Sequence, residues 1–381
     1  MKLFDVYPRY DLEPVSGLGS WIWDQSGGRY LDFYGGHAVI SIGHSHPHYV
    51  DRITTQLRQL GFYSNSVQMP IQAELAMKLG KLSAYPDYQL FLCNSGAEAI
   101  ENALKLASFH TKREKIIVFE RAFHGRTSLA VTATDGKKIV APININDRFI
   151  RLPFNDLEAV SQQLDASVAA VLIEGIQGVG GIHVPTDDFL RGLKTLCKQN
   201  GSLFILDEIQ SGYGRSGKFF SHQFANVTPD LITIAKGMGN GFPIAGVLIQ
   251  PDVKPWSGML GTTFGGNHLA CAAGLAVLEV IETEKLIENA KVMGEKLWGQ
   301  LALLEGLEVV RGRGLMVGLD LPVDSKSFRN KLLIDQKVFV GSASNPNTIR
   351  LLPSLALNDD ELLFFLSAFK SILQDESFFI G

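Results

Sequence analysis

Residues 203–249 read LFILDEIQSGYGRSGKFFSHQFANVTPDLITIAKGMGNGFPIAGVLI, and they decide the fold. The runs LFILDE, DLITIA and IAGVLI are continuously apolar rather than alternating, which is typical of strands covered on both faces. Upstream, QLFLC, KIIVF and VAAVLIE have the same character, and helix-like segments such as 97–110 and 187–200 separate the runs. Repeated strand–helix–strand units predict an α/β fold with a mostly parallel, doubly wound sheet.

The two ends of the chain have a different pattern. Residues 18–34 predict a hairpin with a turn at Gly27, and helices are expected near 267–282, 284–304, 326–335 and 358–374. The simplest arrangement is a smaller α+β domain assembled from both termini around the central sheet. We therefore predict a domain division into 1–45 (small domain), 46–275 (large, ligand-binding domain) and 276–381 (small domain).

Composition excludes several classes of protein. With 381 residues, 46% hydrophobic and 19% charged, the chain can bury a large core, so wholesale disorder is excluded. The formal charge of −4 and the lack of a basic run argue against nucleic acid as a partner. Neither a signal peptide nor a membrane span is expected. Three widely separated cysteines form no disulfide framework and no zinc spacing, so we expect no metal and a cytoplasmic location.

Ligands of an open parallel sheet bind beyond the carboxyl ends of its strands, so the residues after each run carry the functional prediction. QLFLC is followed by Ser95, Gly96 and Ala97 at the start of a helix, where free N–H groups and the helix dipole can bind an anion. The alternative is an ordinary N-cap serine with no ligand.

Two further runs end in ionisable residues. Asp207 closes LFIL, and a buried carboxylate there needs a partner: a cationic ring nitrogen, a metal, an Arg or another structural ion pair. Lys236 follows DLITIA, where partial desolvation would lower the pKa of its amine and make it a nucleophile for carbonyl groups. The alternative is a lysine that extends from a strand end into solvent.

The loop after KIIVF offers an aromatic ring and a cation. Phe123 could stack on a flat cofactor, next to His124, and Arg126 could hold a carboxylate; core packing and a solvated charge are the alternatives. A phosphate cradle, a carboxylate for a pyridinium nitrogen and a Schiff-base lysine together are what pyridoxal phosphate requires.

Two other patterns in the sequence suggest different ligands. Residues 212–218, GYGRSGK, fit a nucleotide-binding P-loop, but Phe219 stands where Ser or Thr is needed. His44, His46 and His48 suggest zinc, but Pro47 and the lack of nearby Cys, Asp or Glu favour a loop or a helix start.

These residues resemble the motifs of class III aminotransferases, which are fold type I pyridoxal-phosphate enzymes, over about residues 7–373. Among them the chain most resembles the acetylornithine and succinylornithine aminotransferases. NSGAEA at 94–99, FHGR at 123–126, DEIQ at 207–210 and AKGMGNGFP at 235–243 carry the resemblance.

The resemblance implies a role for each residue. Ser95, Gly96 and Ala97 would bind the cofactor phosphate, and Phe123 would stack on the pyridine ring beside His124. Asp207 would keep the ring nitrogen protonated, Gln210 would bond the ring hydroxyl, and Lys236 would form the Schiff base and move the proton. Arg126 would bind a substrate carboxylate, and Arg350 the α-carboxylate of 2-oxoglutarate and glutamate.

The segment GTTFGGN at 261–267 also matches a family motif. The resemblance implies that this loop crosses the interface of a homodimer, with Thr263 at the neighbouring subunit's cofactor phosphate and Thr262 near the substrate. One position departs from the family: Val179 stands where a glutamate usually pairs with the arginine that corresponds to Arg350. Without that carboxylate, Arg350 is expected to stay available.

The predicted function is transfer of the δ-amino group of N2-acetylornithine or N2-succinylornithine to 2-oxoglutarate, giving an N-acyl-glutamate 5-semialdehyde and glutamate in arginine metabolism. The alternatives are an ornithine δ-aminotransferase or a transaminase of 4-aminobutyrate or another ω-amino acid. From a different class, a nucleotide-dependent enzyme using the Gly212–Lys218 loop is the remaining candidate.

Overall fold

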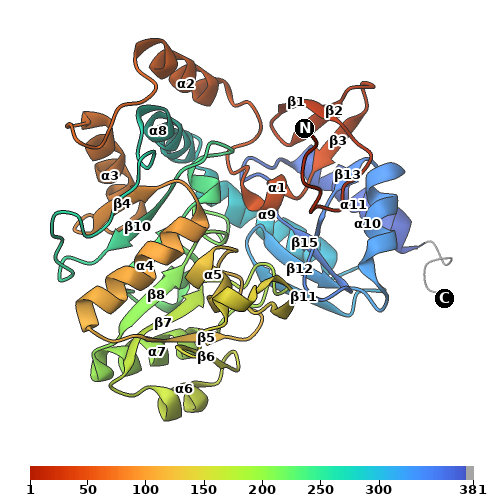
Figure 1. Ribbon diagram of the computed structural model, residues 1–381. Coiled ribbons are helices and arrows are strands. Elements are labelled where there is room, and N and C mark those ends of the chain that lie inside the picture. Colours follow the sequence, from red (N-terminus) through yellow and green to blue (C-terminus); the bar gives the residue numbers. More distant parts are fainter. Residues whose placement is uncertain (375–381) are drawn as a thin grey trace.

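The computed structural model describes residues 1–374. Within that range, a seven-stranded sheet forms the centre of the molecule (Figure 1). Its spatial order is β4 (Gln89–Cys93), β10 (Ala245–Ile249), β9 (Leu231–Ile234), β8 (Leu203–Asp207), β7 (Val168–Glu174), β5 (Lys115–Phe119) and β6 (Phe149–Leu152).

The six apolar runs of the sequence all became strands of this sheet, which confirms the doubly wound α/β prediction. Neighbours from β9 to β6 are parallel, whereas β10 runs antiparallel to both β9 and β4. Strand β6 had not been predicted, because it lies at the sheet edge and only Leu152 is buried in it. An edge strand half exposed to solvent lacks the continuous apolar run of its neighbours.

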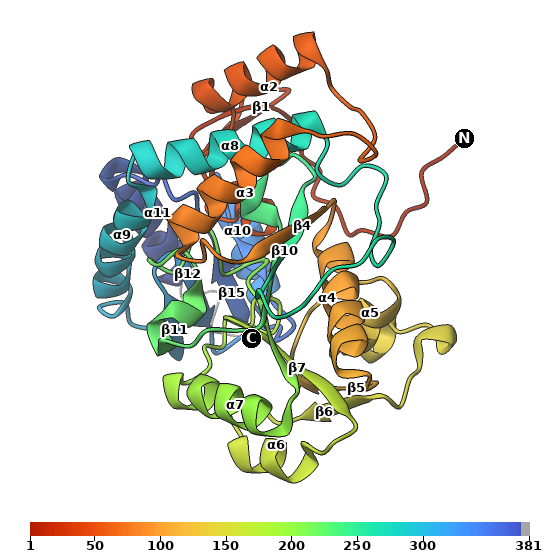
Figure 2. The ribbon, with the colours of Figure 1, turned by 90° about the vertical axis from the view of Figure 1, so that its left-hand side faces the viewer.

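Helices cover both faces of the sheet. Helices α4 (Gly96–Thr111) and α5 (Ser128–Ala133) lie on one face, and α6 (Leu157–Gln163) and α7 (Asp187–Asn200) on the other. Helix α7 ends at Asn200, as the predicted segment 187–200 does, and Gly201 follows as a left-handed C-cap with φ 70°. Figure 2 shows α2 (Pro47–Gln59), α3 (Pro70–Ser83) and α8 (His268–Thr283) packed side by side beyond β4.

Two smaller sheets join the ends of the chain. The first has the order β1 (Pro14–Leu18), β2 (Trp21–Asp24), β3 (Arg29–Asp32) and β13 (Val338–Phe339); the second has the order β11 (Val309–Arg313), β12 (Met316–Asp320), β15 (Thr348–Leu351) and β14 (Gly341–Ser342). Helices α9 (Leu286–Leu301), α10 (Ser325–Ile334) and α11 (Asp359–Leu373) complete this part.

The small sheets confirm the predicted α+β module built from both termini. Strand β13 pairs in parallel with β3, with Val338 opposite Leu31, and β2 and β3 form the expected hairpin. The residue numbers given above for the domain boundaries stay a prediction. No helix within residues 1–374 combines the length and apolar character that crossing a bilayer requires.

A short segment after β3 has unusual backbone geometry. Residues Gly35–Ala38 (α1) all have positive φ, between 53° and 68°, so this turn is left-handed. Glycine adopts that conformation readily, whereas His37 and Ala38 do so against the preference of their Cβ atoms. A conformation of this kind persists only where the surroundings hold it in place.

Candidate active site

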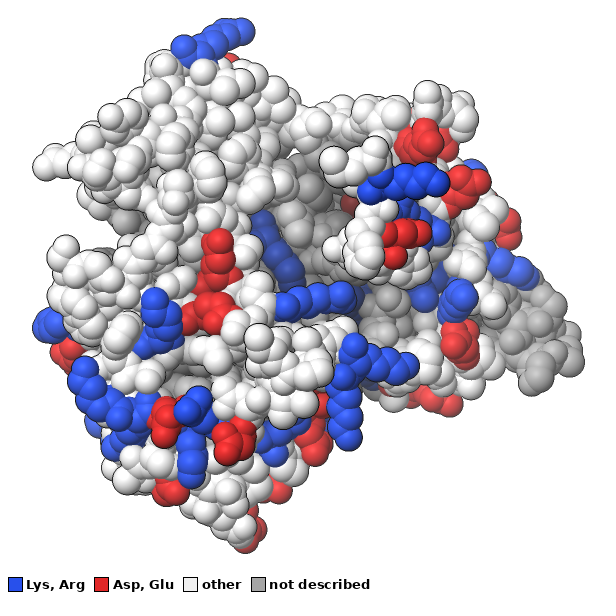
Figure 3. Space-filling model, in the orientation of Figure 1, with Lys and Arg blue, Asp and Glu red and all other residues white. Residues whose placement is uncertain are grey.

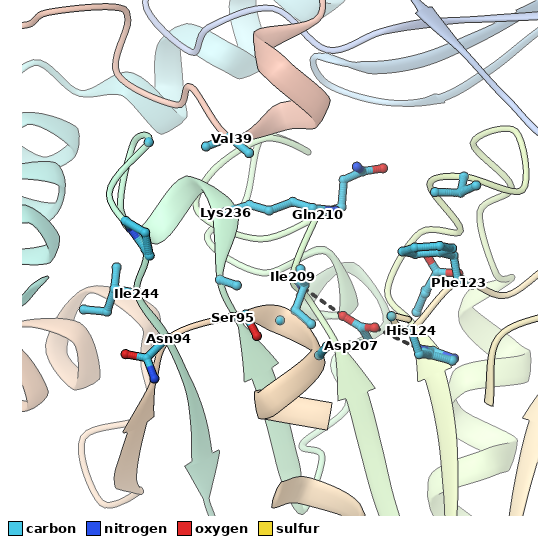
Figure 4. Close-up of a pocket in the computed structure, with 18 of the residues that line it drawn as sticks. Val39, Asn94, Ser95, Phe123, His124, Asp207, Ile209, Gln210, Lys236 and Ile244 are labelled. Atoms are coloured by element: carbon cyan, nitrogen blue, oxygen red, sulfur yellow. Dashed lines mark hydrogen bonds and ion pairs between the residues drawn. The ribbon is translucent and has the colours of Figure 1, made fainter. Parts of the chain in front are cut away.

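A cavity of ≈ 310 Å³ lies where the strands of the large sheet end. Figure 4 shows Lys236 and Gln210 above the strand ends, with Val39 above Lys236. Eight of the residues predicted for the site line it together: Ser95, Gly96, Ala97, Phe123, His124, Asp207, Gln210 and Lys236.

The start of α4 forms one wall of the cavity. Ser95 is the N-cap, and its Oγ accepts a hydrogen bond from Glu98 N at 3.2 Å. In the part of the chain that the structure describes, the N–H groups of Gly96 and Ala97 have no hydrogen-bond partner. They lie at the positive end of a 16-residue helix, so this wall is suited to bind an anion.

Asp207 is buried at the end of β8 and has two donors. Its Oδ2 accepts from His124 Nδ1 at 2.7 Å, and its Oδ1 accepts from Ile209 N at 3.0 Å. The sequence had left the partner of this carboxylate open, and the structure supplies the His124 ring. The other ring nitrogen, His124 Nε2, is buried without a hydrogen-bond partner among residues 1–374.

Lys236 lies two residues after the end of β9, in a backbone conformation with φ 46°. Burial lowers the pKa of its amine to about 8; the carboxylates of Asp207 and Glu174 oppose that shift, and the cations Arg350 and Arg215 add to it. Its Nζ has no hydrogen bond or ion pair within the described residues. The strand end therefore presents an amine that is neutral far more often than an ordinary lysine.

Glu174 is a cavity residue that the sequence interpretation missed. Its carboxylate accepts from Phe123 N and from Gly178 N, both at 2.9 Å, and so ties two loops to the end of β7. Burial raises its pKa to about 7. The rule that singled out Asp207 applies equally here, because Glu174 is the last residue of an apolar run.

Arg350 lies behind Gln210 rather than in the cavity wall. It comes from β15, is 3% exposed, and donates from Nη1 to Gln210 Oε1 at 3.4 Å and from Nη2 to the Tyr34 hydroxyl at 3.3 Å. Gln210 Nε2 donates to the His37 carbonyl at 3.0 Å. The amide of Gln210 is thus bonded within the chain, and its role toward a ring hydroxyl stays a prediction.

Besides Arg350, three predicted site residues lie outside this cavity. Thr262 is adjacent to it, since its Oγ1 accepts from Asn94 Nδ2 at 3.1 Å. Thr263 and Arg126 are exposed. Basic side chains border the hollow at the centre of Figure 3, between the part that carries α2–α4 and the part that carries β1–β3.

The two competing patterns have structural roles. In the loop Gly212–Lys218, Tyr213 and Arg215 are fully buried, and Lys218 Nζ donates to the Gln223 carbonyl at 3.0 Å, so the loop is packed rather than open for a phosphate.

The three histidines bond separate carboxylates: His44 with Asp32, His46 with Glu284 and His48 with Glu279. Helix α2 begins at Pro47, which confirms the helix-start interpretation. Among residues 1–374, no group of three or more His, Cys, Asp or Glu is arranged to hold a metal ion.

Comparisons with known proteins agree with this geometry. Residues 8–373 match the family described as aminotransferase class-III. The chain is 40% identical over 375 residues to the acetylornithine aminotransferase of Nitrosomonas europaea, covering 94% of each chain. It is 37% identical to that of Caldanaerobacter subterraneus, covering 99% of this chain and 98% of the relative.

A solved structure of the ornithine aminotransferase from Toxoplasma gondii superposes with a TM-score of 0.90 at 28% identity, covering 96% of this chain and 90% of that one. Its description reports partial occupancy of PLP at the active site.

Proposed function

The chain belongs to the class-III aminotransferases, and from that premise we propose which amino group it moves and which acceptor takes it. It is a pyridoxal-phosphate-dependent transaminase that transfers the δ-amino group of N2-acetylornithine to 2-oxoglutarate. The products are N-acetylglutamate 5-semialdehyde and glutamate, which places the reaction in arginine metabolism. The near full-length similarity to acetylornithine aminotransferases supports this substrate.

The described residues fit the cofactor. The unpartnered N–H groups of Gly96 and Ala97 suit its phosphate, and the Asp207 carboxylate suits a protonated ring nitrogen. The Lys236 amine is free of other partners and can react with an aldehyde. Bound pyridoxal phosphate supplies that aldehyde and a ring that accepts the electron pair left when a carbon–hydrogen bond of the substrate breaks.

Three side chains of the site, Lys236, His124 and Glu174, have separate roles in the reaction. Lys236 Nζ, with its pKa near 8, takes a proton from the δ-carbon of the donor and returns one to the acceptor. His124 holds the Asp207 carboxylate in a fixed orientation, and Glu174 fixes Phe123 at the loop that follows β5. The buried Lys236 amine in this cavity is the single observation that best supports assignment of the reaction as a transamination.

Val179 leaves Arg350 without the carboxylate partner that the family usually provides. Val179 lines the cavity where the family usually has glutamate, and no carboxylate pairs with Arg350 within residues 1–374. Arg350 is therefore available to the α-carboxylate of 2-oxoglutarate or glutamate at every stage. Exposed Arg126, at the side of the cavity, is assigned to the α-carboxylate of acetylornithine.

A homodimer is part of the proposal. Phe62 and Phe264 are 42% and 60% exposed, with ring centroids 5.5 Å apart, beside the loop that carries Thr263. Asn65 Nδ2 ties the two segments by donating to Gly265 O at 3.0 Å. An exposed aromatic pair supports an interface, across which Thr263 would reach the partner's cofactor phosphate.

We assign the enzyme to the cytoplasm, in keeping with its free, buried Cys93, Cys197 and Cys271.

One half-reaction tests the function. The yellow holoenzyme is mixed separately with N-acetylornithine, N-succinylornithine, ornithine and 4-aminobutyrate, and the loss of its visible absorbance is followed. We expect fast conversion with N-acetylornithine. Conversion by ornithine or 4-aminobutyrate with both acylornithines inert would refute the proposed substrate but keep the reaction class.

A further inference from the structure

The left-handed turn Gly35–Ala38 is held from two sides. Asp32 Oδ1 accepts from Tyr34 N at 3.0 Å and from Gly35 N at 2.8 Å at its start, and Gln210 Nε2 donates to the His37 carbonyl near its end. Its handedness folds the His37 ring back onto the ring of Tyr34, at a centroid distance of 4.7 Å. Hydrogen bonds at both ends of the turn thus hold the His37 backbone in place.

Tyr34 and His37 close a circuit of hydrogen bonds with Arg350 and Gln210. The Tyr34 hydroxyl contacts His37 Nδ1 and accepts from Arg350 Nη2. Arg350 Nη1 donates to Gln210 Oε1, and Gln210 Nε2 in turn donates to the His37 carbonyl. The four residues come from segments far apart in sequence, at positions 34–37, 210 and 350.

The direction of these hydrogen bonds follows from proton counting. A tyrosine hydroxyl has one proton, and the guanidinium of Arg350 can only donate. The Tyr34 proton therefore points to His37 Nδ1, which must be unprotonated. Burial and the nearby cations Arg350, Lys236 and Arg126 lower the pKa of His37 to about 4, so the ring is neutral at physiological pH.

Every acceptor that Arg350 has in the described chain is neutral: the Ser342 carbonyl, the Gln210 amide oxygen and the Tyr34 hydroxyl. Neutral acceptors orient a guanidinium without cancelling its charge, which stays available to a carboxylate. Space for the tyrosine ring depends on Gly341, where an added Cβ would lie 2.1 Å from Tyr34 Cε2.

We propose that Tyr34 and His37 are positioning residues, which hold Arg350 in the orientation that receives the carboxylate of the dicarboxylic substrate. The inference rests on the proposed function in taking that substrate to be 2-oxoglutarate. It predicts that loss of either group weakens binding of the dicarboxylate and leaves binding of the amino donor unchanged.

The test uses the holoenzyme and two readouts. The first is the KM for 2-oxoglutarate against the KM for N-acetylornithine; the second is the Kd of glutarate, a dicarboxylate that binds but cannot react. For Tyr34→Phe, which loses one acceptor of a charged hydrogen bond, the KM for 2-oxoglutarate and the glutarate Kd should rise about tenfold. The kcat and the KM for N-acetylornithine should change less than about twofold.

Two His37 variants separate positioning from folding. His37→Leu removes the acceptor and should match Tyr34→Phe, and the double variant should be no worse than either single one, because the two groups act in series. His37→Asn should restore near wild-type values, since asparagine offers an acceptor near the Nδ1 position and tolerates positive φ. Tyr88→Phe, which loses a hydroxyl bonded to the Pro229 carbonyl, is the matched control.

An unchanged or lowered glutarate Kd in Tyr34→Phe, in protein that retains its cofactor absorbance, would overturn the inference. An equal rise in both KM values would also overturn it, because that pattern indicates general damage. If the wild-type enzyme converts no acylornithine, the proposed substrate fails, while the glutarate comparison still decides the role of Tyr34 and His37.

Discussion

His124 and Asp207 are bonded across an intervening strand. His124 follows β5 and Asp207 ends β8, with β7 between them in the sheet, yet the imidazole Nδ1 lies 2.7 Å from the carboxylate Oδ2. Both residues are almost fully buried. A charge-assisted hydrogen bond in such a place orients the carboxylate toward the cavity that both residues line.

His124→Leu should lower kcat about ten- to a hundredfold, because Asp207 loses a charged hydrogen bond worth about 1.5–3 kcal/mol. His124→Asn keeps a donor near the Nδ1 position and should lose much less. Steady-state kinetics of the two variants, at equal cofactor content, checks this. Equal losses in both would mean that the imidazole acts through packing alone.

Asp207→Asn should lower kcat by about a thousandfold or more, on the order of 4 kcal/mol of barrier. The amide keeps the shape of the side chain but no longer stabilises a positive ring nitrogen. Single-turnover rates with N-acetylornithine measure the effect. A rate within a few-fold of wild type would return Asp207 to the role of a structural partner of His124.

Lys236→Ala should abolish turnover and leave the fold intact, because the amine has no structural partner among residues 1–374. Circular dichroism reports the fold and product formation reports the activity. Lys198→Ala, on the exposed face of α7, is the matched control. Turnover close to wild type in Lys236→Ala would contradict the proposed mechanism.

The pKa of Lys236 predicts how the apoprotein takes up its cofactor. Because burial lowers that pKa from 10.5 to about 8, the neutral amine increases as pH rises and predominates above about pH 8. The rate of reaction with pyridoxal phosphate should therefore rise with pH and level off above 8. The same measurement on Lys236→Ala subtracts the reaction of surface lysines. A rate that still climbs steeply toward pH 10 would show an ordinary lysine.

Val179→Glu would place a carboxylate on the cavity wall. The resemblance to the family leads us to expect that this carboxylate pairs with Arg350. The half-reaction with glutamate should then slow relative to the half-reaction with acetylornithine. Val179→Gln has the same size without the charge and should change the ratio far less. If Val179→Glu leaves the ratio of the two rates at the wild-type value, Val179 has no part in separating the substrates.

The part of the site that sequence predicts is the part that follows continuous apolar strands. Ser95, Phe123, Asp207 and Lys236 line one cavity because parallel strands bring their carboxyl ends to one edge. The reversal of β10 was not predictable from composition, since a strand covered on both faces has the same apolar run in either direction.

Tyr34 and His37 escaped prediction for a different reason. Their contacts depend on Arg350 and Gln210, which are more than 170 positions away, and the only local signal is the glycine pair before His37. Helix α2 was not located beyond its start, although Tyr49, Ile53 and Leu57 recur at helical spacing; none of its residues is buried among those that the structure describes.

The late position of β15 in the chain has a consequence for the order in which the enzyme becomes competent. During synthesis, the residues that line the cavity leave the ribosome well before Arg350, and the Leu352 N–H that bonds the Phe33 carbonyl emerges later still. A nascent chain halted before β15 would carry Lys236 and the carboxylates of the cavity but would lack Arg350, the group assigned to the α-carboxylate of 2-oxoglutarate. Selectivity is thus the last property that the growing polypeptide acquires.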